Sequence, residues 1–210
     1  CFANHDRIAE LNLYDGKAGR YFSGSPVPLA EELRTWALGE AEAISSVTYP
    51  RERPYYVELS PEKTLPYELE TIEIDTCYNR IFTPEMVAGH WKMASQSLNS
   101  VILSQSMAIK IFGNAESAIG KHMTLMRRLN TSPESTPKTG GIVYTIQAVM
   151  KDIPLNNSLD FMQNIDMLTV NDSEGLLQSP KRHNMTGANT YVLLSPQTTC
   201  TDLEKQFSKR

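Results

Sequence analysis

The residues that could bind a metal or attack a substrate are few in this chain, and they are scattered. Its four histidines, His5, His90, His122 and His183, lie in unrelated stretches. None has a second histidine or a carboxylate three or four residues away, as the helical zinc motif HExxH requires. No GxSxG motif is present, and no cysteine lies in a nucleophile motif. We therefore predict neither a metal site nor a covalent catalyst.

Binding of a nucleotide or a nucleic acid is not indicated either. The chain has no Walker A motif and no GxGxxG motif, so no phosphate-binding loop and no cofactor are predicted. A net charge of −4 and a pI near 5.6 argue against a nucleic-acid partner, which would require a basic face. The acidic residues are dispersed, and the sequence nominates no catalytic pair. We predict a non-enzyme; a hydrolase whose site is assembled in space stays an alternative, and it would show a deep pocket with convergent polar groups.

The cysteines leave the question of anchoring open. The chain has three, Cys1, Cys77 and Cys200, with no CxxC or zinc spacing, so small incidental thiols are the simplest interpretation. In an oxidising compartment one disulfide could form. No run of 18 apolar residues occurs, so no membrane-spanning helix is predicted within the chain. A start at Cys1 fits a fragment cut just after a membrane helix, or a lipoprotein whose first residue carries the lipid.

The elements that would position any site mix helices and strands irregularly, which is typical of the α+β class. The clearest helix is PLAEELRTWALG, with Pro28 in its first turn and Gly39 at its end. A half-buried strand is expected at Arg7–Leu13. Another is expected at Glu70–Asp75, with its carboxylates on the exposed face.

Proline and polar stretches mark the remaining boundaries. Pro50 and Pro54 are expected to separate two short strands, Ile44–Tyr49 and Tyr55–Leu59. The polar stretch Asn130–Gly141 is interpreted as an exposed hairpin loop. Further strands are predicted at 123–127, 142–150, within 161–170 and at 190–194. The final helix is expected to open on a T-x-x-E capping box, Thr201 to Glu204.

The best-defined unit lies at the centre of the chain, in VILSQSMAIKIFG. Val101 to Leu103 supply a buried strand, and the Ser104 hydroxyl can accept from the free N–H groups of a helix that follows. An apolar stripe then includes Ala108 and Phe112. Gly113 ends the helix, because glycine takes a positive φ without a Cβ penalty.

This unit, extended to Gly120-Lys121, resembles a segment in the extracytoplasmic domain of FtsX-like, MacB-like ABC transporter permeases. That family continues with a Y-x-I-x-x-V strand, then D-x-P and an Asn/Ser turn, here Tyr144–Val149, Asp152-Ile153-Pro154 and Asn157-Ser158. Upstream, Asn4–Ile8 is similar to the family's first strand, and downstream Thr190–Phe207 is similar to its last strand and helix. The Asn130–Gly141 loop departs from the family, because it is longer than the usual hairpin.

The resemblance implies a fold of two α+β lobes. A first, Porter-like lobe would use residues 1–85 and 184–210, and a second, Sabre-like lobe would be inserted at 86–183. The resemblance gives structural roles to the motif residues, with direct partner contact as the alternative. These residues are Ser104, Ala108, Phe112, Gly113, Gly120, Lys121, Asp152 and Pro154.

The resemblance also implies a function. The chain would be the periplasmic domain of a permease in the bacterial inner membrane, relaying ATP-driven motion of its membrane helices to a substrate or partner outside. The implied partners are the parent's own membrane helices, a cytoplasmic ABC ATPase, a second permease copy and a periplasmic protein. The alternative function is a surface lipoprotein or binding module anchored through Cys1.

Overall fold

The chain folds into two compact units. The computed structural model describes residues 4–36, 39–60, 62–97, 99–125, 141–153, 164–170 and 186–207. Unit 1 comprises Cys1–Tyr49, Glu73–Pro84 and Asn171–Arg210, and unit 2 comprises Pro50–Ile72 and Glu85–Val170. Each unit contains both helices and strands, which confirms the α+β class. No helix in the described part of the chain has the length and apolar character of a membrane span.

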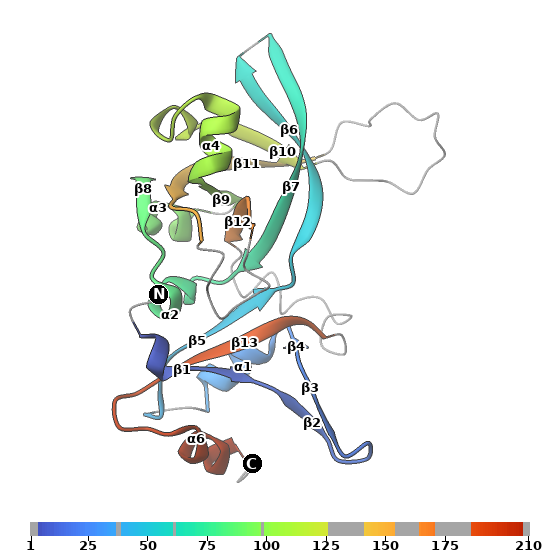
Figure 1. Cartoon of the computed structure of the whole chain (residues 1–210), viewed down its shortest axis with the longest axis vertical. Helices are drawn as coiled ribbons and strands as arrows, with labels where there is room; N and C mark the ends of the chain where they lie inside the picture. The colour runs from blue at the N-terminus through green and yellow to red at the C-terminus, as the bar shows by residue number, and fades with distance from the viewer. Residues whose placement is uncertain are drawn as a thin grey trace. The chain divides into compact units, whose positions relative to one another are not determined.

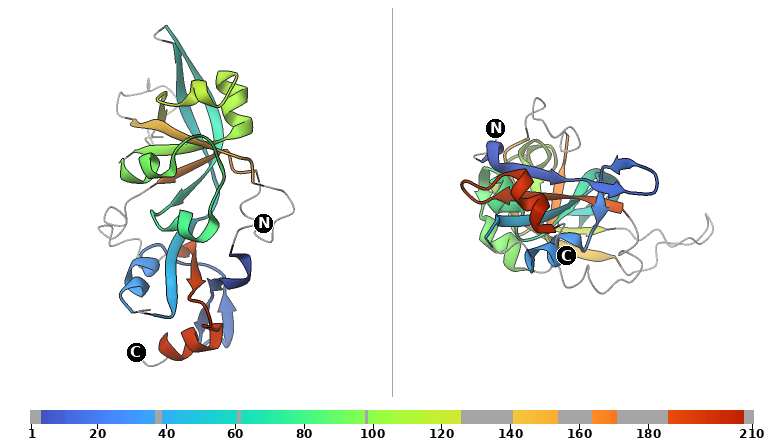
Figure 2. Two further views of the ribbon diagram at one scale, coloured as in Figure 1. Left: turned by 90° about the vertical axis from the view of Figure 1, so that its left-hand side faces the viewer. Right: turned by 90° about the horizontal axis from the view of Figure 1, so that it is seen from below.

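Unit 2 is built on a closed six-stranded sheet (Figures 1 and 2). Its strands, in spatial order, are β6 (Arg51–Ser60), β7 (Lys63–Ile74), β12 (Met167–Val170), β9 (Ser100–Ser104), β11 (Ile142–Met150) and β10 (His122–Leu125). β10 pairs with β6 and β6 pairs with β7, so the sheet closes on itself. Closure removes exposed edges from these strands.

Side chains alternate along the strands of this closed sheet, which gives it a buried inner face and an exposed outer face. Along β6 and β7, Tyr55, Val57 and Leu69 are fully buried, whereas Glu52 and Glu68 are exposed. The period of two sends the apolar set to one face and the glutamates to the other. The buried set forms one core cluster with side chains from β9, β10, β11 and β12.

Helices and an added strand cover part of unit 2. β8 (Met86–Gly89) pairs with β11, and α3 (Trp91–Gln96) contacts both β11 and β9. α4 (Gln105–Phe112) follows β9 directly and packs Met107, Ala108 and Ile111 into the core cluster. β9 is buried along its whole length. The strand, helix and terminal glycine expected at 101–113 are therefore confirmed.

Unit 1 is built around β13 (Thr186–Leu194). β13 pairs with β1 (Ile8–Leu11) on one side and β5 (Ala41–Thr48) on the other, both antiparallel, and also with β4 (Ser25–Pro26). The last residue of β7, Ile74, pairs with Val47 of β5. Helices α1 (Leu29–Arg34) and α6 (Cys200–Phe207) pack on this sheet through Leu33 and Leu203. α2 (Tyr78–Phe82) contacts β5 and β13, and η1 (His5–Arg7) precedes β1.

A separate two-stranded hairpin extends from unit 1. Its strands are β2 (Leu13–Asp15) and β3 (Arg20–Phe22), which pair only with each other among the described residues. The strand expected at Arg7–Leu13 is therefore divided between η1, β1 and the start of β2.

Two helix boundaries differ from the sequence predictions. α1 ends at Arg34 with Thr35 as its C-cap, so the helix stops short of Gly39. α6 begins at Cys200, and its capping box lies two residues earlier than expected. The Thr199 hydroxyl donates to Asp202 Oδ2 at 2.6 Å and accepts from the Asp202 N–H at 3.3 Å, so the box is T-x-x-D and Thr201 lies inside the helix.

Two strand predictions also need correction. β6 runs through Pro54 instead of breaking there. Within the described part of the chain, β10 pairs with Tyr55–Val57 and β7 pairs with β6 on both sides of Pro54, so the strand continues through the proline. Asp75 was expected on an exposed face, but it is only 3% exposed, because β7 ends at Ile74 and the Asp75 carboxylate is hydrogen-bonded to Ser45 and Ser46 of β5.

The compact units and the expected lobes differ most in one segment; unit 1 also includes residues 171–183, and unit 2 also includes Glu85. Unit 2 contains Pro50–Ile72, which the expected lobes assign to the first. The physical reason is pairing, because β6 and β7 complete the closed sheet with β10 and β12. The assignment of the units as Porter-like and Sabre-like lobes stays a prediction, and most of the Asn130–Gly141 loop lies outside the described residues.

Candidate functional site

The motif residues predicted from the sequence gather around α4 in unit 2. At the start of the helix, the Ser104 side chain accepts from the Met107 N–H at 3.3 Å, and Ser104 has the extended backbone of an N-cap. Asp152 Oδ1 accepts from the Ser106 N–H at 3.0 Å. Two oxygens from distant parts of the chain thus satisfy two of the free donors of the first turn.

The other motif residues hold the ends of neighbouring elements. Gly113 has φ +86° and donates its N–H to Ile109 O at 2.9 Å, which closes α4. Gly120 has φ +78° and donates to Ile146 O of β11 at 2.8 Å. Ala108 is fully buried, and Phe112 packs against the core cluster. Lys121 is exposed, and Pro154 lies outside the described residues.

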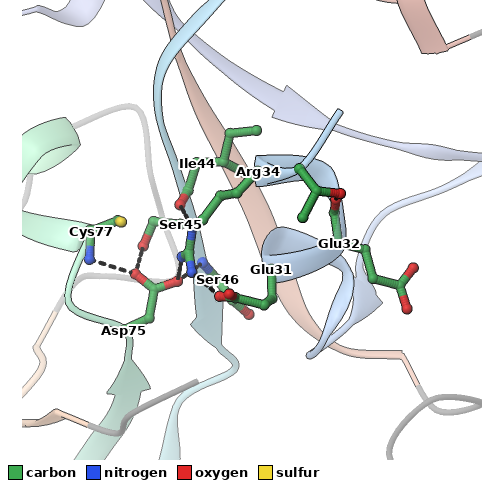
Figure 3. A network of polar contacts seen from close by, with 9 residues as sticks. Glu31, Glu32, Arg34, Ile44, Ser45, Ser46, Asp75 and Cys77 are labelled. Carbon is green, nitrogen blue, oxygen red and sulfur yellow. Dashed lines mark hydrogen bonds and ion pairs between the residues drawn. The ribbon is translucent and has the colours of Figure 1, made fainter. Parts of the chain in front are cut away.

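The most concentrated set of polar contacts lies in unit 1, around Asp75 (Figure 3). The Asp75 carboxylate accepts from the Ser45 hydroxyl at 2.8 Å and from the backbone N–H groups of Ser46 and Cys77, both at 2.9 Å. It also accepts from the Arg34 guanidinium. One buried side chain therefore ties together α1, β5 and the chain entering α2.

Arg34 bridges this network to the surface. Its Nε donates to Ile44 O at 2.9 Å, and its guanidinium pairs with Glu31 one turn earlier in α1 as well as with Asp75. Burial alone would lower the pKa of Arg34. The negative charges around it, led by Asp75, outweigh burial and raise that pKa, so the cation is fixed at any physiological pH.

Cys77 lies beside this network, but its thiol is not activated. Burial is the main cause that raises the pKa of Cys77, and nearby Asp75 adds to it, against the opposite effect of Arg34 and Arg80. A thiol above its ordinary pKa is mostly protonated near neutral pH and is a poor nucleophile. The network has the character of a structural clamp: every charge is paired, and Asp75 is closed off from solvent.

A smaller group of carboxylates lies on unit 2. Asp166 accepts from the Glu70 N–H at 2.9 Å, and Glu70 lies directly opposite Glu52 across the β6–β7 pair. Burial, followed by the negative charges of Glu52 and Asp166, raises the pKa of Glu70. Burial also raises the pKa of Asp166, against the opposite effects of the Glu70 N–H and of Lys110. Among the residues that the structure describes, no three His, Cys, Asp or Glu side chains are placed to hold a metal ion.

Sequence reasoning missed the clamp around Asp75. The predicted motif residues meet around α4, whereas Arg34, Ser45 and Asp75 come from three distant segments and none belongs to a motif. The only usable signal was that Asp75 follows a strand and precedes Thr76-Cys77, a position where a carboxylate often bonds its own following backbone.

Comparison with known proteins identifies the fold. The chain superimposes over its whole length on a domain of a candidate permease from Porphyromonas gingivalis, at 22% identity and a TM-score of 0.73, covering 84% of that chain. It matches the periplasmic region of MacB from Actinobacillus actinomycetemcomitans at 16% identity and a TM-score of 0.58, with 96% of this chain and 79% of that chain covered. The chain has the MacB periplasmic fold.

A third structure with the MacB periplasmic fold extends the range of bacteria. The extracellular domain of the noncanonical ABC-type transporter YknZ from Gram-positive bacteria matches 95% of this chain and 88% of its own, at 12% identity and a TM-score of 0.50. No protein-family model matches the sequence, and no curated protein matches it. At these identities the likeness lies in the fold and not in shared residues.

Proposed function

We propose that this chain is the extracytoplasmic domain of an ABC-type transporter permease, in which it relays ATP-driven motion of membrane helices to a substrate or partner outside the membrane. The observation that carries the proposal is the MacB periplasmic fold over nearly the entire chain. Of the three similar structures, one is described as a domain of a candidate permease and one as the extracellular domain of an ABC-type transporter. The order of the family-like motifs along the sequence supports it independently.

The internal construction of each unit suits a relay. A domain that transmits motion needs stiff bodies, because compliant ones absorb displacement. In unit 1 the clamp around Asp75 fixes α1 to β5, and in unit 2 a closed sheet and a doubly capped α4 fix β9 to the helix that follows. Rigid packing of this kind transmits strain between contacting elements.

The proposed assembly follows from this role. The parent would lie in the bacterial inner membrane with this domain on the periplasmic side. It would act with a second permease copy, a cytoplasmic ABC ATPase and, in the periplasm, a partner protein. The finer division into a Porter-like and a Sabre-like lobe belongs to the same proposal. By itself the chain should bind no nucleotide and should dimerise weakly or not at all.

A label on α6 tests the relay directly. Cys200 is exposed on this helix and accepts a fluorophore in a Cys1→Ser background, whereas Cys77 is half-buried with a raised pKa. The full-length protein is purified with its ATPase, and ATP is added. We expect the fluorescence to change with ATP in the complex and to stay constant in the isolated chain.

A hydrolysis-deficient ATPase is the matched control, and it should abolish the cycling of the signal. Failure of any ATPase to co-purify, with no response to ATP, would overturn the proposal. A parent protein that carries a lipid on Cys1 and has no membrane helices would favour the lipoprotein alternative instead.

A further inference from the structure

The β2–β3 hairpin of unit 1 presents an exposed pair of aromatic side chains. Tyr14 and Tyr21 lie directly opposite each other, with ring centroids 4.9 Å apart. They are 59% and 73% exposed, the two highest values among the large apolar or aromatic side chains described as exposed. Two adjacent aromatic rings with this much exposed area form an apolar surface patch, and such a patch is typical of an interaction site.

The tip between these strands is built rigidly. Asp15 Oδ1 accepts from the N–H groups of Lys17 and Ala18 at 2.8 and 3.1 Å, and Asp15 O accepts from the Gly19 N–H at 2.8 Å. Gly19 takes φ +64°, which the turn requires. The one carboxylate of the tip is therefore occupied by the backbone of its own turn.

The charge that remains facing solvent is positive. Lys17 and Arg20 are exposed, and the Arg20 guanidinium lies 4.6 Å from the centre of the Phe22 ring. The tip thus carries two cations and one internally bonded carboxylate, in a chain whose net charge is −4. Tyrosine combined with lysine or arginine is the chemistry of the membrane interface, where amphipathic rings lie at the headgroup level and cations meet anionic lipid.

The position of the hairpin within unit 1 agrees with such a contact. Figure 1 and the right view of Figure 2 show it projecting sideways from the other elements of the unit, and in Figure 1 its tip lies at the level of α6, the last described helix of the chain. If the parent is a permease, the chain after α6 returns to the membrane. An apolar, basic tip at that end would then face lipid.

We propose that the tip of the β2–β3 hairpin docks into the headgroup layer of an anionic membrane through Tyr14, Tyr21, Lys17 and Arg20. The proposal rests on the proposed function for the presence of a membrane, but it concerns a surface of this chain alone. The tyrosine rings would enter the interface, while the two cations would pair with lipid phosphates.

The experiment uses the 210-residue chain attached to vesicles by a histidine tag after Arg210. The vesicles contain nickel-chelating lipid in phosphatidylcholine, with or without phosphatidylglycerol. Ala18→Cys carries a polarity-sensitive dye, in a Cys1→Ser, Cys200→Ser background. We expect a blue shift of the dye on phosphatidylglycerol vesicles that far exceeds the shift on phosphatidylcholine alone.

Variants of the tip separate the two contributions. Lys17→Glu and Arg20→Glu should each reduce the ratio of docked to undocked tip by about fivefold or more. The double variant Tyr14→Ser, Tyr21→Ser should abolish the blue shift on both kinds of vesicle. Leu65→Ser, in the exposed part of β7 on unit 2, is the matched control and should leave the shift unchanged.

Three results would overturn the proposal. The shift could be independent of phosphatidylglycerol, or it could survive the two charge reversals. It could also occur without vesicles as the chain is concentrated, which would assign the tip to a second copy of the chain. The two charge variants leave both tyrosines in place, so they still test the proposal if the tyrosine variant folds poorly. Failure here with an intact ATP response at Cys200 would leave the proposed function standing.

Discussion

Replacing Asp75 by alanine removes the acceptor on which the clamp of unit 1 depends. The variant leaves the Ser45 hydroxyl and the N–H groups of Ser46 and Cys77 without this acceptor, and it removes the more buried of the two carboxylates that pair with the Arg34 guanidinium. The Asp75 side chain is 4% exposed, so water cannot replace it without opening the structure. We expect a large loss of stability confined to unit 1.

The magnitude follows from the burial of the two ions. Breaking a buried ion pair by removing one partner costs about 3–5 kcal/mol. The Arg34 side chain is 22% exposed, so water recovers part of the loss, and we expect the lower part of that range, about 3 kcal/mol. With a urea m value of about 2 kcal/mol/M, the midpoint of unit 1 should fall by about 1.5 M.

The two tryptophans provide a separate probe of each unit. Trp36 lies in unit 1 and Trp91 in unit 2, and the chain has no others. In a Trp91→Phe background, urea unfolding reports unit 1, and Asp75→Ala should shift this transition. In a Trp36→Phe background the same variant should leave the transition of unit 2 nearly unchanged.

A surface ion pair supplies the control. Glu42 pairs with Arg7 at 2.9 Å, with side chains 36% and 27% exposed, so Glu42→Gln should cost less than about 1 kcal/mol. An Asp75→Ala effect as small as that of Glu42→Gln would refute the reasoning. An equal shift of both tryptophan signals would refute its restriction to unit 1.

Three further outcomes are expected. Gly89→Ala should destabilise unit 2 by more than about 2 kcal/mol, because the new Cβ would lie 2.2 Å from Gln147 O at φ +68°. Gly120→Ala, with φ +78° but open space around the new Cβ, should cost only about 1 kcal/mol. The urea midpoints of the two variants measure the difference. Thr199→Ala should cost about 1 kcal/mol and Thr201→Ala less than about 0.5, and the reverse order would contradict the observed cap. The pKa of Glu70 is raised above 4.5, first by burial and then by its acidic neighbours. The protonated Glu70 side chain therefore contributes to stability below pH 4.5, and this contribution is lost as the pH rises through the folded pKa. Glu70→Gln should therefore stabilise unit 2 slightly at pH 7, by about 0.5 kcal/mol or less, and should not stabilise it at pH 4. Equal stabilisation at the two pH values would contradict the raised pKa of Glu70.

Features whose cause is local were predictable from the sequence. Ser104, the apolar stripe of α4 and Gly113 act within one strand and one helix, so their spacing alone determines what they do. β11 was predicted with its observed bounds, because Ile142–Met150 has strong strand propensity and clear turn residues on both sides. The resemblance to the permease family rested on these same segments.

Features that depend on distant residues were not predictable in this way. The buried state of Asp75 requires Arg34 and Ser45, and nothing near Asp75 in the sequence indicates them. The cap of α6 shows a subtler limit. Thr199-x-x-Asp202 and Thr201-x-x-Glu204 are overlapping boxes with similar intrinsic strength, so packing of Leu203 against unit 1 has to select between them.

The order in which the strands leave the ribosome bears on how this chain reaches its fold. Every strand of unit 2 lies before Asn171, so its closed sheet has all its parts before β13 is made. Unit 1 is different, because β13 lies between β1 and β5 and pairs with both. Its first strands are synthesised more than a hundred residues before their common partner. Until β13 is made, these strands lack their common partner, so we expect unit 2 to fold first and unit 1 to depend more on chaperones.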